Sequence, residues 1–242
     1  MSEPASHVEV QPAATVMLVR DAGGRRGGSL EVLLVRRHPE SVFAADAWVF
    51  PGGRVDDGDR AGPPIASGPS DAEASRALGL PDGGLAYWVA AARECFEEAG
   101  ILLARHAETG GWLDASTEWS AARLNRHRRD VHTGVTTLGA LLEAEGLVLD
   151  LSGLHYVSHW ITPPGLTARR FDTRFFVAEV PPGQVASHDA AETVESVWMA
   201  PADALARGAA GEIHLLIPTI ANLKTLARFS SVAEIVESQC PT

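Results

Sequence analysis

The sequence predicts a layered domain of mixed helices and strands, of the α/β or α+β class. Three observations support this prediction. The 242 residues suit one domain with added segments, or at most two small domains. Hydrophobic residues make up 45% of the chain and charged residues 21%, which is enough apolar material for a packed core. Short apolar stretches typical of strands also alternate with segments of helical periodicity.

The N-terminal part is predicted to contain strands joined by turns. Residues 15–20 and 30–37 are apolar and rich in aliphatic residues, and the glycine-rich segment between them is typical of a hairpin loop. Residues 48–50 form another short apolar stretch, which runs into a chain reversal at 51–53. Residues 56–69 are rich in Asp, Gly and Pro, so we expect an irregular segment there.

The strongest predicted helix covers residues 85–99. Gly100 follows it directly, in the position where a glycine commonly ends a helix. A shorter helix is predicted over 70–78, because Ser70 followed by Glu73 forms a capping-box pattern.

Beyond residue 100 the mixture of strand and helix patterns continues. Strands are expected in short β-branched or aromatic stretches, and helices where apolar residues recur with helical spacing. The expected strands cover 101–104, 154–161, 171–180 and 194–199. The expected helices cover 116–130, 137–145, 201–207, 218–229 and 232–237.

The composition excludes several classes of protein. A formal net charge of −11 argues against binding to duplex nucleic acid or to an anionic membrane surface. The cysteines, Cys95 and Cys240, suggest neither a disulfide framework nor a cysteine-rich zinc site. We expect no signal peptide, because the N-terminus is polar, and no spanning helix, because no apolar run is long enough. A reducing cytoplasm is the expected location.

Three acidic residues gather on the predicted helix 85–99. Glu94, Glu97 and Glu98 are spaced i, i+3 and i+4, so they project from one stripe, while the opposite stripe is apolar. Like charges at this spacing repel, and Mg²⁺ or Mn²⁺ would remove the repulsion. A solvated acidic face is the alternative explanation. The turn at 48–53 favours a metal site, because its paired glycines allow the backbone to approach a phosphate closely.

This region resembles the Nudix box, whose pattern is G-x5-E-x7-R-E-U-x-E-E-x-G-U, with U an aliphatic residue. Gly53 matches the first glycine, Asp59 stands where the family has its first glutamate, and Cys95 occupies the first aliphatic position. The residues that match the second half are Arg93, Glu94, Glu97, Glu98, Gly100 and Ile101.

The chain departs from the pattern in the middle of the box. Asp59 and Arg93 are 34 positions apart, where the family has eight, so 26 residues are inserted. Such an insertion resembles the Nudix branch of peroxisomal coenzyme A diphosphatases and their bacterial relatives. Residues 32–37, 160–164 and 169–176 also resemble that branch.

The resemblance implies a Nudix-type α/β/α sandwich with a mixed sheet and added helices. It also implies a chemistry in which water attacks a phosphorus atom of a diphosphate. Glu97 and Glu98 are then the expected primary ligands of Mg²⁺ or Mn²⁺, and Glu94 is a third ligand or the general base. Arg93 is expected to orient the carboxylates by ion pairing.

The expected substrate-binding residues are Gly53, Arg37 and Arg170. Gly53 would supply backbone geometry, and the two arginines would receive substrate phosphates. A surface charge is the alternative for either arginine. Asp59 is left open because the insertion can carry its carboxylate away from the site. In several Nudix enzymes a further acidic residue from a distant loop completes the site. Glu192 is the candidate for that residue here, and a solvated loop explains it at least equally well.

The resemblance implies coenzyme A or an acyl-coenzyme A as substrate. The better-known coenzyme A motif has an arginine and a glycine where this chain has Phe43 and Asp46, so ADP-ribose and dinucleoside polyphosphates are alternatives. A non-catalytic nucleotide-binding module on the same fold is an alternative of another class. The intact trio of Glu94, Glu97 and Glu98 argues against that module.

The expected organisation is a flexible lead over 1–12, a Nudix domain over 13–230 and a C-terminal tail over 231–242. Residues 60–84 form the insertion within the box, and 112–146 form a helical insertion. The expected partner is a small nucleotide-diphosphate substrate, with no nucleic acid and no membrane. A homodimer is also considered.

Overall fold

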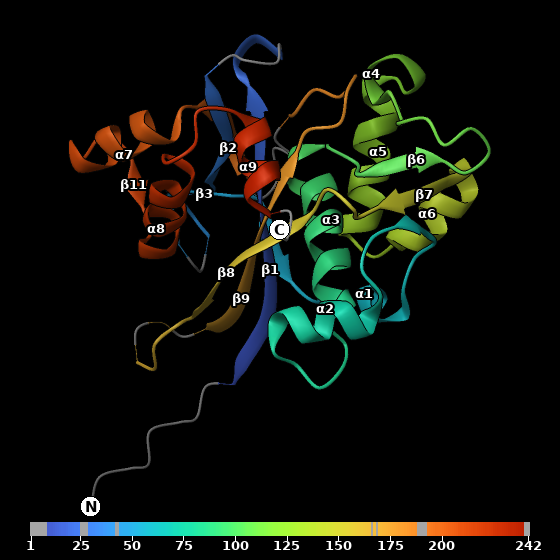
Figure 1. The fold of residues 1–242 in the computed structure, drawn as a ribbon, viewed down its shortest axis with the longest axis horizontal. Helices are drawn as coiled ribbons and strands as arrows, with labels where there is room; N and C mark the ends of the chain where they lie inside the picture. Colours follow the sequence, from blue (N-terminus) through green and yellow to red (C-terminus); the bar gives the residue numbers. More distant parts are fainter. Residues whose placement is uncertain are drawn as a thin grey trace, which may run out of the picture.

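The computed structural model describes residues 9–24, 29–41, 44–165, 167, 169–187 and 193–239. A mixed β-sheet lies at its centre, with helices on both faces (Figure 1). Helix α3 (Leu85–Ala99) packs on one face. The helices on the other face are α7 (Pro201–Ala209), α8 (Ile217–Leu226) and α9 (Val232–Gln239). The predicted α/β/α sandwich with a mixed sheet and added helices is therefore confirmed.

The central strand of the sheet is β1 (Val10–Asp21). It runs parallel to β9 (Arg170–Glu179) through ten paired residues. Strand β8 (His155–Ile161) pairs antiparallel with β9 and completes this side of the sheet. The strands predicted at 154–161 and 171–180 are therefore confirmed, to within a residue at each end.

The other half of the sheet is built on β2 (Leu30–Arg37). β1 pairs with β2 only near its end, through residues 19–21, and it pairs with β4 (Gly52–Arg54) near its start. β1 and β2 therefore diverge, and the turn from β3 (Ala47–Val49) to β4 fills the space between them. Two further strands pair with β2 and β3 respectively, namely β10 (Thr193–Met199) and β11 (His214–Leu215).

Side chains of β1 alternate between two hydrophobic cores. Ala14, Val16 and Leu18 pack with α3, whereas Met17 and Val19 pack on the side of α7, α8 and α9. All five are at most 1% exposed. Because both faces of β1 are covered, its sequence is a continuous apolar run rather than an alternating pattern.

A second sheet of three strands lies beyond α3. Its strands are, in order, β5 (Ile65–Ser67), β7 (Leu147–Asp150) and β6 (Ala104–His106). The prediction of a strand at 101–104 is wrong, because pairing with β7 begins only at Ala104. Strand β7 was not predicted from the sequence. Strands this short carry little pattern of their own, and partners distant in sequence decide whether they form.

The expectation of an irregular segment at 56–69 is also wrong. This segment contains α1 (Asp57–Ala61) as well as β5. The backbone N–H of Asp56 donates to Asp59 Oδ2 at 2.8 Å, which supports the first turn of α1. The many Asp and Gly residues therefore begin and end short elements here.

Local signals place the helix ends well. Helix α2 (Asp71–Leu78) has the predicted capping box: Ser70 Oγ accepts from the Glu73 backbone, and Glu73 accepts from the Ser70 backbone at 2.8 Å. Gly100 ends α3 in the left-handed conformation, with φ 69°. The helix predicted at 137–145 is α6 (Leu138–Glu145).

The single helix predicted at 116–130 is two helices in the structure. They are α4 (Ala115–Glu118) and α5 (Ala121–His132). Trp119, between them, has an extended backbone and a buried side chain that packs in the α3 core. Ser120 then begins α5, because its hydroxyl accepts from the Arg123 backbone.

Both predicted terminal boundaries need adjustment. Strand β1 begins at Val10, so the last three residues of the predicted lead 1–12 belong to the sheet. In the described part of the predicted tail 231–242, α9 buries Val232 and Ile235 in the second core. Across the described ranges, no helix combines the length and apolar character needed for a membrane span.

Partial burial of His155, at the start of β8, predicts a pH dependence of stability. Burial lowers the pKa of His155 in the folded protein below its ordinary value of about 6.5. Below about pH 6.5 the unfolded state therefore binds a proton that the folded state does not, and the free energy of unfolding falls. Urea titrations between pH 7.5 and 5.5 should show a smaller loss in His155→Gln than in the original chain. Equal losses in the two proteins would contradict this prediction.

Candidate active site

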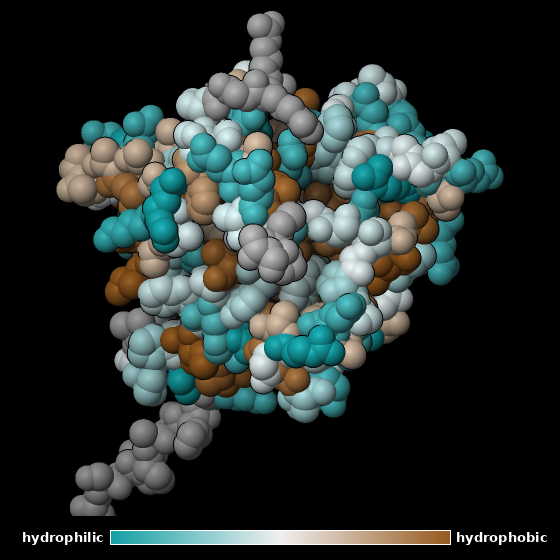
Figure 2. Space-filling view, in the orientation of Figure 1, coloured by the Kyte–Doolittle hydropathy of each residue, from teal (hydrophilic) through white to brown (hydrophobic). Residues whose placement is uncertain are grey.

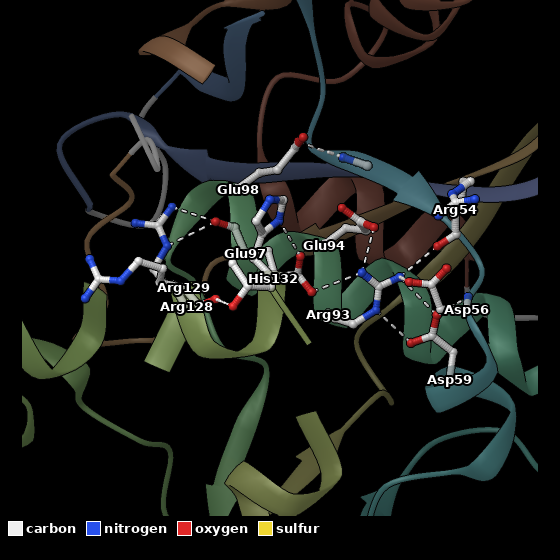
Figure 3. Close-up of polar contacts among 12 residues, drawn as sticks. Arg54, Asp56, Asp59, Arg93, Glu94, Glu97, Glu98, Arg128, Arg129 and His132 are labelled. Carbon is white, nitrogen blue, oxygen red and sulfur yellow. Dashed lines mark hydrogen bonds and ion pairs between the residues drawn. The ribbon is translucent and has the colours of Figure 1, made fainter. Parts of the chain in front are cut away.

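The three carboxylates predicted on one helical stripe do lie together on the second half of α3. Glu94, Glu97 and Glu98 are 9%, 6% and 3% exposed, so none is an ordinary solvated side chain. Figure 3 shows Glu94 and Glu97 directed toward Arg93, whereas Glu98 is directed toward β4. Close burial of like charges is costly unless cations and hydrogen-bond donors compensate it.

Arg93 provides much of that compensation. Its Nη1 donates to Glu94 Oε1 at 2.7 Å and to Glu97 Oε1 at 3.0 Å, while Nη2 donates to the Arg54 carbonyl at 2.7 Å. Burial by itself would lower the pKa of Arg93, but the surrounding carboxylates of Glu94, Asp59 and Glu97 outweigh it and raise that pKa. Arg93 therefore makes the ion pairs that its predicted orienting role would require.

Asp59 joins this cluster in spite of the insertion. Its Oδ1 accepts from Arg93 Nε at 2.9 Å and its Oδ2 from Nη2 at 3.0 Å, a two-point contact between planar groups. Asp59 is 3% exposed. The chain between Asp59 and Arg93 forms a long excursion that ends back at the cluster. The two halves of the motif are therefore in contact, although these two residues are 34 positions apart.

The glycine turn packs directly on the carboxylates. The Gly52 N–H donates to Glu98 Oε2 at 3.0 Å. A Cβ added to Gly53 would lie 2.3 Å from Glu94 Oε1, far inside van der Waals contact. A side chain at position 53 would therefore have to displace the Glu94 carboxylate, which fills that space. This observation concerns the support of Glu94, whereas the sequence indicated a contact with substrate.

Two residues of α5 complete the cluster, and neither was predicted. Arg128 is 3% exposed and donates through Nε and Nη2 to the Glu97 carbonyl at 3.1 and 2.8 Å. His132 Nδ1 lies 3.1 Å from Glu97 Oε2. Their i, i+4 spacing places both on one face of α5, but no signal in the sequence indicates which helix that face contacts.

The predicted substrate arginines are carried by strands of the main sheet and not by α3. Arg37 ends β2, and its buried Nε has no hydrogen-bond partner among the described residues. Arg170 begins β9 and donates to the Thr162 carbonyl at 3.0 Å. Arg170 pairs with Val10 and lies four residues along the sheet from the Ala14 position that pairs with Gly53, or about 13 Å.

Two other positions bear on the sequence predictions. Asp46, in the place where the coenzyme A motif has a glycine, pairs with Arg36, whose Nε donates to it at 2.8 Å. Phe43 and Glu192 lie outside the described residues. The interaction proposed for Glu192 is therefore still a prediction.

The candidate metal ligands are all carboxylate oxygens, which is the type of ligand that a hard divalent cation prefers. Within the described ranges, however, no group of three or more His, Cys, Asp or Glu side chains forms a ready metal site. Among the described residues, each Glu97 oxygen accepts one hydrogen bond, from Arg93 or His132, and a carboxylate oxygen has capacity for two. The ligand type therefore fits a divalent cation, although the three carboxylates do not converge on one position in this structure.

The local charge also fits a divalent cation. The buried acids Asp59, Glu94, Glu97 and Glu98 carry four negative charges, and the guanidinium groups of Arg93 and Arg128 carry two positive ones. With His132 neutral, two negative charges are left in this set, which one divalent cation would offset.

A groove of about 670 Å³ between α7 and α8 is separate from this site. It is lined mainly by apolar residues, including Leu205, Ile213 and Ile220. Figure 2 shows apolar surface on the side where Figure 1 places these two helices. The groove lies on the other side of the sheet from α3, so it offers no access to the carboxylates.

A family model described as the NUDT19 Nudix domain matches residues 61–226. The chain belongs to the Nudix family. The match begins after Gly53 and Asp59, so it covers only the second half of the Nudix box. In the structure, Arg93 contacts Asp59 and Glu94 packs against Gly53, so the second half of the box lies next to the first.

The Nudix relatives include proteins named acyl-coenzyme A diphosphatase NUDT19. The protein from Gallus gallus is 34% identical, and the alignment covers 92% of this chain and 69% of the relative. The protein from Homo sapiens is 31% identical over 84% of this chain and 62% of the relative. This chain thus spans less than two thirds of the human protein.

A solved structure supports the same family fold. The NUDIX hydrolase from Alicyclobacillus acidocaldarius superposes with a TM-score of 0.76 and is 30% identical. The superposition covers 98% of this chain and all of that protein. The sandwich with its inserted segments is therefore an arrangement also found in a bacterial Nudix hydrolase.

The contact of Asp59 with Arg93 predicts a stability effect that a nearby acid does not share. Asp59→Asn removes one charge of a buried pair and should lower the free energy of unfolding by about 3 kcal/mol. Asp56 is the matched control, because its side chain is 52% exposed and 3.8 Å from Arg93. Asp56→Asn should cost less than about 1 kcal/mol in the same urea titration. Equal effects of the two changes would contradict the assignment.

The close packing of Gly53 predicts a second effect. Gly53→Ala should displace the Glu94 carboxylate and lower the turnover number by about 10²-fold, as misplaced catalytic groups commonly do. Gly58→Ala is the control, since a Cβ there meets no atom within 4 Å. Steady-state kinetics of both variants would check this, and unchanged turnover in Gly53→Ala would refute it.

Proposed function

We propose that this chain is a divalent-metal-dependent diphosphatase that cleaves coenzyme A or an acyl-coenzyme A. The single observation that carries the proposal is the buried group of Glu94, Glu97 and Glu98 on α3, of which Arg93 holds the first two, in a chain that belongs to the Nudix family. The proposed substrate is suggested by the relatives named acyl-coenzyme A diphosphatase, which match most of the chain.

We assign the metal ligands within the α3 cluster. Glu97 and Glu98 would be the primary ligands of Mg²⁺ or Mn²⁺, and Glu94 would be a third ligand or the general base. A bound divalent ion neutralises phosphate oxygens and lowers the pKa of a coordinated water. A carboxylate that is not a ligand can take the proton that the attacking water loses.

The remaining roles follow from charge and position. Arg93 holds Glu94 and Glu97 by direct hydrogen bonds, so it would keep both carboxylates oriented during the reaction. Arg37 offers a buried Nε with no hydrogen-bond partner among the described residues, which supports a role in binding an anionic group of the substrate. Arg170 would act farther along the sheet, at a distance that suits an extended substrate. Gly53 would contribute by supporting Glu94.

Location and assembly are proposed on the sequence alone. The small number of cysteines favours a reducing cytoplasm. Homodimer formation is a hypothesis that light scattering of the purified protein would test.

A substrate panel with product identification tests the proposed function. The panel contains coenzyme A, an acyl-coenzyme A, ADP-ribose and a dinucleoside polyphosphate, each with Mg²⁺ or Mn²⁺. Coenzyme A should yield 3′,5′-ADP and 4′-phosphopantetheine. AMP and ribose 5-phosphate from ADP-ribose as the preferred reaction would replace the proposed substrate. Binding without turnover of any compound would indicate a non-catalytic module.

The metal assignment predicts the effect of two conservative variants. Glu97→Gln and Glu98→Gln keep the side-chain size but remove the charge that would hold the metal ion, so each should lower turnover by about 10²–10⁴-fold. Glu143→Gln, on the exposed side of α6, is the matched control and should leave turnover unchanged. Wild-type turnover in both active-site variants would show that the ligands are elsewhere.

A further inference from the structure

We propose that His132, at the end of α5, is a positioning residue for Glu97 and thereby for the metal site. This inference rests on the proposed function, because it assumes that Glu97 is a metal ligand. His132 belongs to the helical insertion at 112–146 and lies outside the Nudix box. The site of this chain would then extend beyond its motif.

The geometry places the Glu97 carboxylate between two donors. Arg93 Nη1 donates to Oε1 at 3.0 Å, and His132 Nδ1 lies 3.1 Å from Oε2 (Figure 3). An ionised carboxylate only accepts hydrogen bonds, so Nδ1 of His132 carries the proton in this contact. With both oxygens held, the carboxylate plane is fixed, and one lone pair on each oxygen is left for another ligand.

The backbone of Glu97 is held by the same face of α5. Arg128 donates twice to the Glu97 carbonyl, at 3.1 and 2.8 Å, one turn before His132. This carbonyl belongs to the last turn of α3, where carbonyl groups lack partners within the helix. Arg128 therefore determines where α5 contacts α3, and His132 then reaches the carboxylate of the same residue.

The end of α3 is anchored by a third segment. Arg128 Nη1 donates to Ser187 Oγ at 3.0 Å, and the Ser187 N–H donates to the Ala99 carbonyl at 2.8 Å. Arg128 is 3% exposed, whereas the His132 side chain is 36% exposed. Removing Arg128 would therefore disturb packing, while a change at His132 can be made with little effect on the core. His132 is the better residue for a test.

The expected consequence is a loss of metal affinity rather than of substrate affinity. Hydrogen bonds to a metal-ligating side chain usually contribute about 10–100-fold to metal affinity or activity. Without His132 the Glu97 carboxylate can rotate, and its orientation toward the metal ion is lost. KM for the diphosphate substrate should change little, because His132 is not expected to contact substrate.

The experiment compares His132→Ala, His132→Asn and a control, His214→Ala. The amide nitrogen of asparagine can occupy about the position of the histidine Nδ1, so His132→Asn keeps the donor. His214 is exposed on β11, on the other side of the sheet. Mn²⁺ affinity of each metal-free protein is measured by calorimetry, together with the thermal midpoint, kcat and KM. Glu97→Gln is measured in parallel.

We expect His132→Ala to bind Mn²⁺ about tenfold more weakly and to lose kcat, with KM within about twofold of the original. His132→Asn should recover most of the affinity, and His214→Ala should behave as the original chain. If Glu97→Gln loses Mn²⁺ binding while His132→Ala keeps it, the positioning role is refuted and the proposed function stands. If Glu97→Gln also binds Mn²⁺ normally, the ligand assignment and this inference both fail.

Discussion

The buried guanidinium of Arg93 is the group on which the geometry of the site depends. It contacts Asp59 in α1, Glu94 and Glu97 in α3, and the Arg54 carbonyl in β4. A charge that is largely removed from water is tolerated only when it is paired. The buried carboxylates are stabilised by the guanidinium of Arg93, and the guanidinium is stabilised by the carboxylates. This mutual pairing fixes how the segments that carry these groups are arranged.

The sheet provides the second constraint, because the divergence of β1 and β2 creates the place where α3 approaches the glycine turn. β1 pairs with β2 at one end and with β4 at the other, so the turn between β3 and β4 enters the gap. There the Gly52 N–H meets Glu98 and the Cα of Gly53 lies against Glu94. A side chain at position 53 would collide with the Glu94 carboxylate and displace it. The backbone of the glycine turn therefore supports the carboxylates of Glu94 and Glu98 on the side that faces the sheet.

The two segments predicted to be insertions bring residues into contact with the carboxylate cluster and do not merely extend the fold. The insertion within the box begins in α1, which carries Asp59 back to Arg93, and continues through β5 and α2. Helix α5, in the segment predicted to be a helical insertion, returns to the end of α3, where Arg128 and His132 contact Glu97. Distance along the chain is therefore a poor guide to distance in the folded protein. The relative with a TM-score of 0.76 spans the same segments, so they are part of the architecture.

The resemblance to the Nudix box implied the sandwich, and the pattern of residues by itself determined the mixed α/β character, most strand and helix positions, and the stripe of Glu94, Glu97 and Glu98 on α3. These features depend on local periodicity and on caps such as Ser70 and Gly100, which act over a few residues. Only the tertiary structure decided whether Asp59 reaches Arg93, what a side chain at position 53 would meet, and which helix α5 contacts. Those outcomes depend on pairings between segments far apart in the chain, and the requirement that buried charges be compensated selects among them.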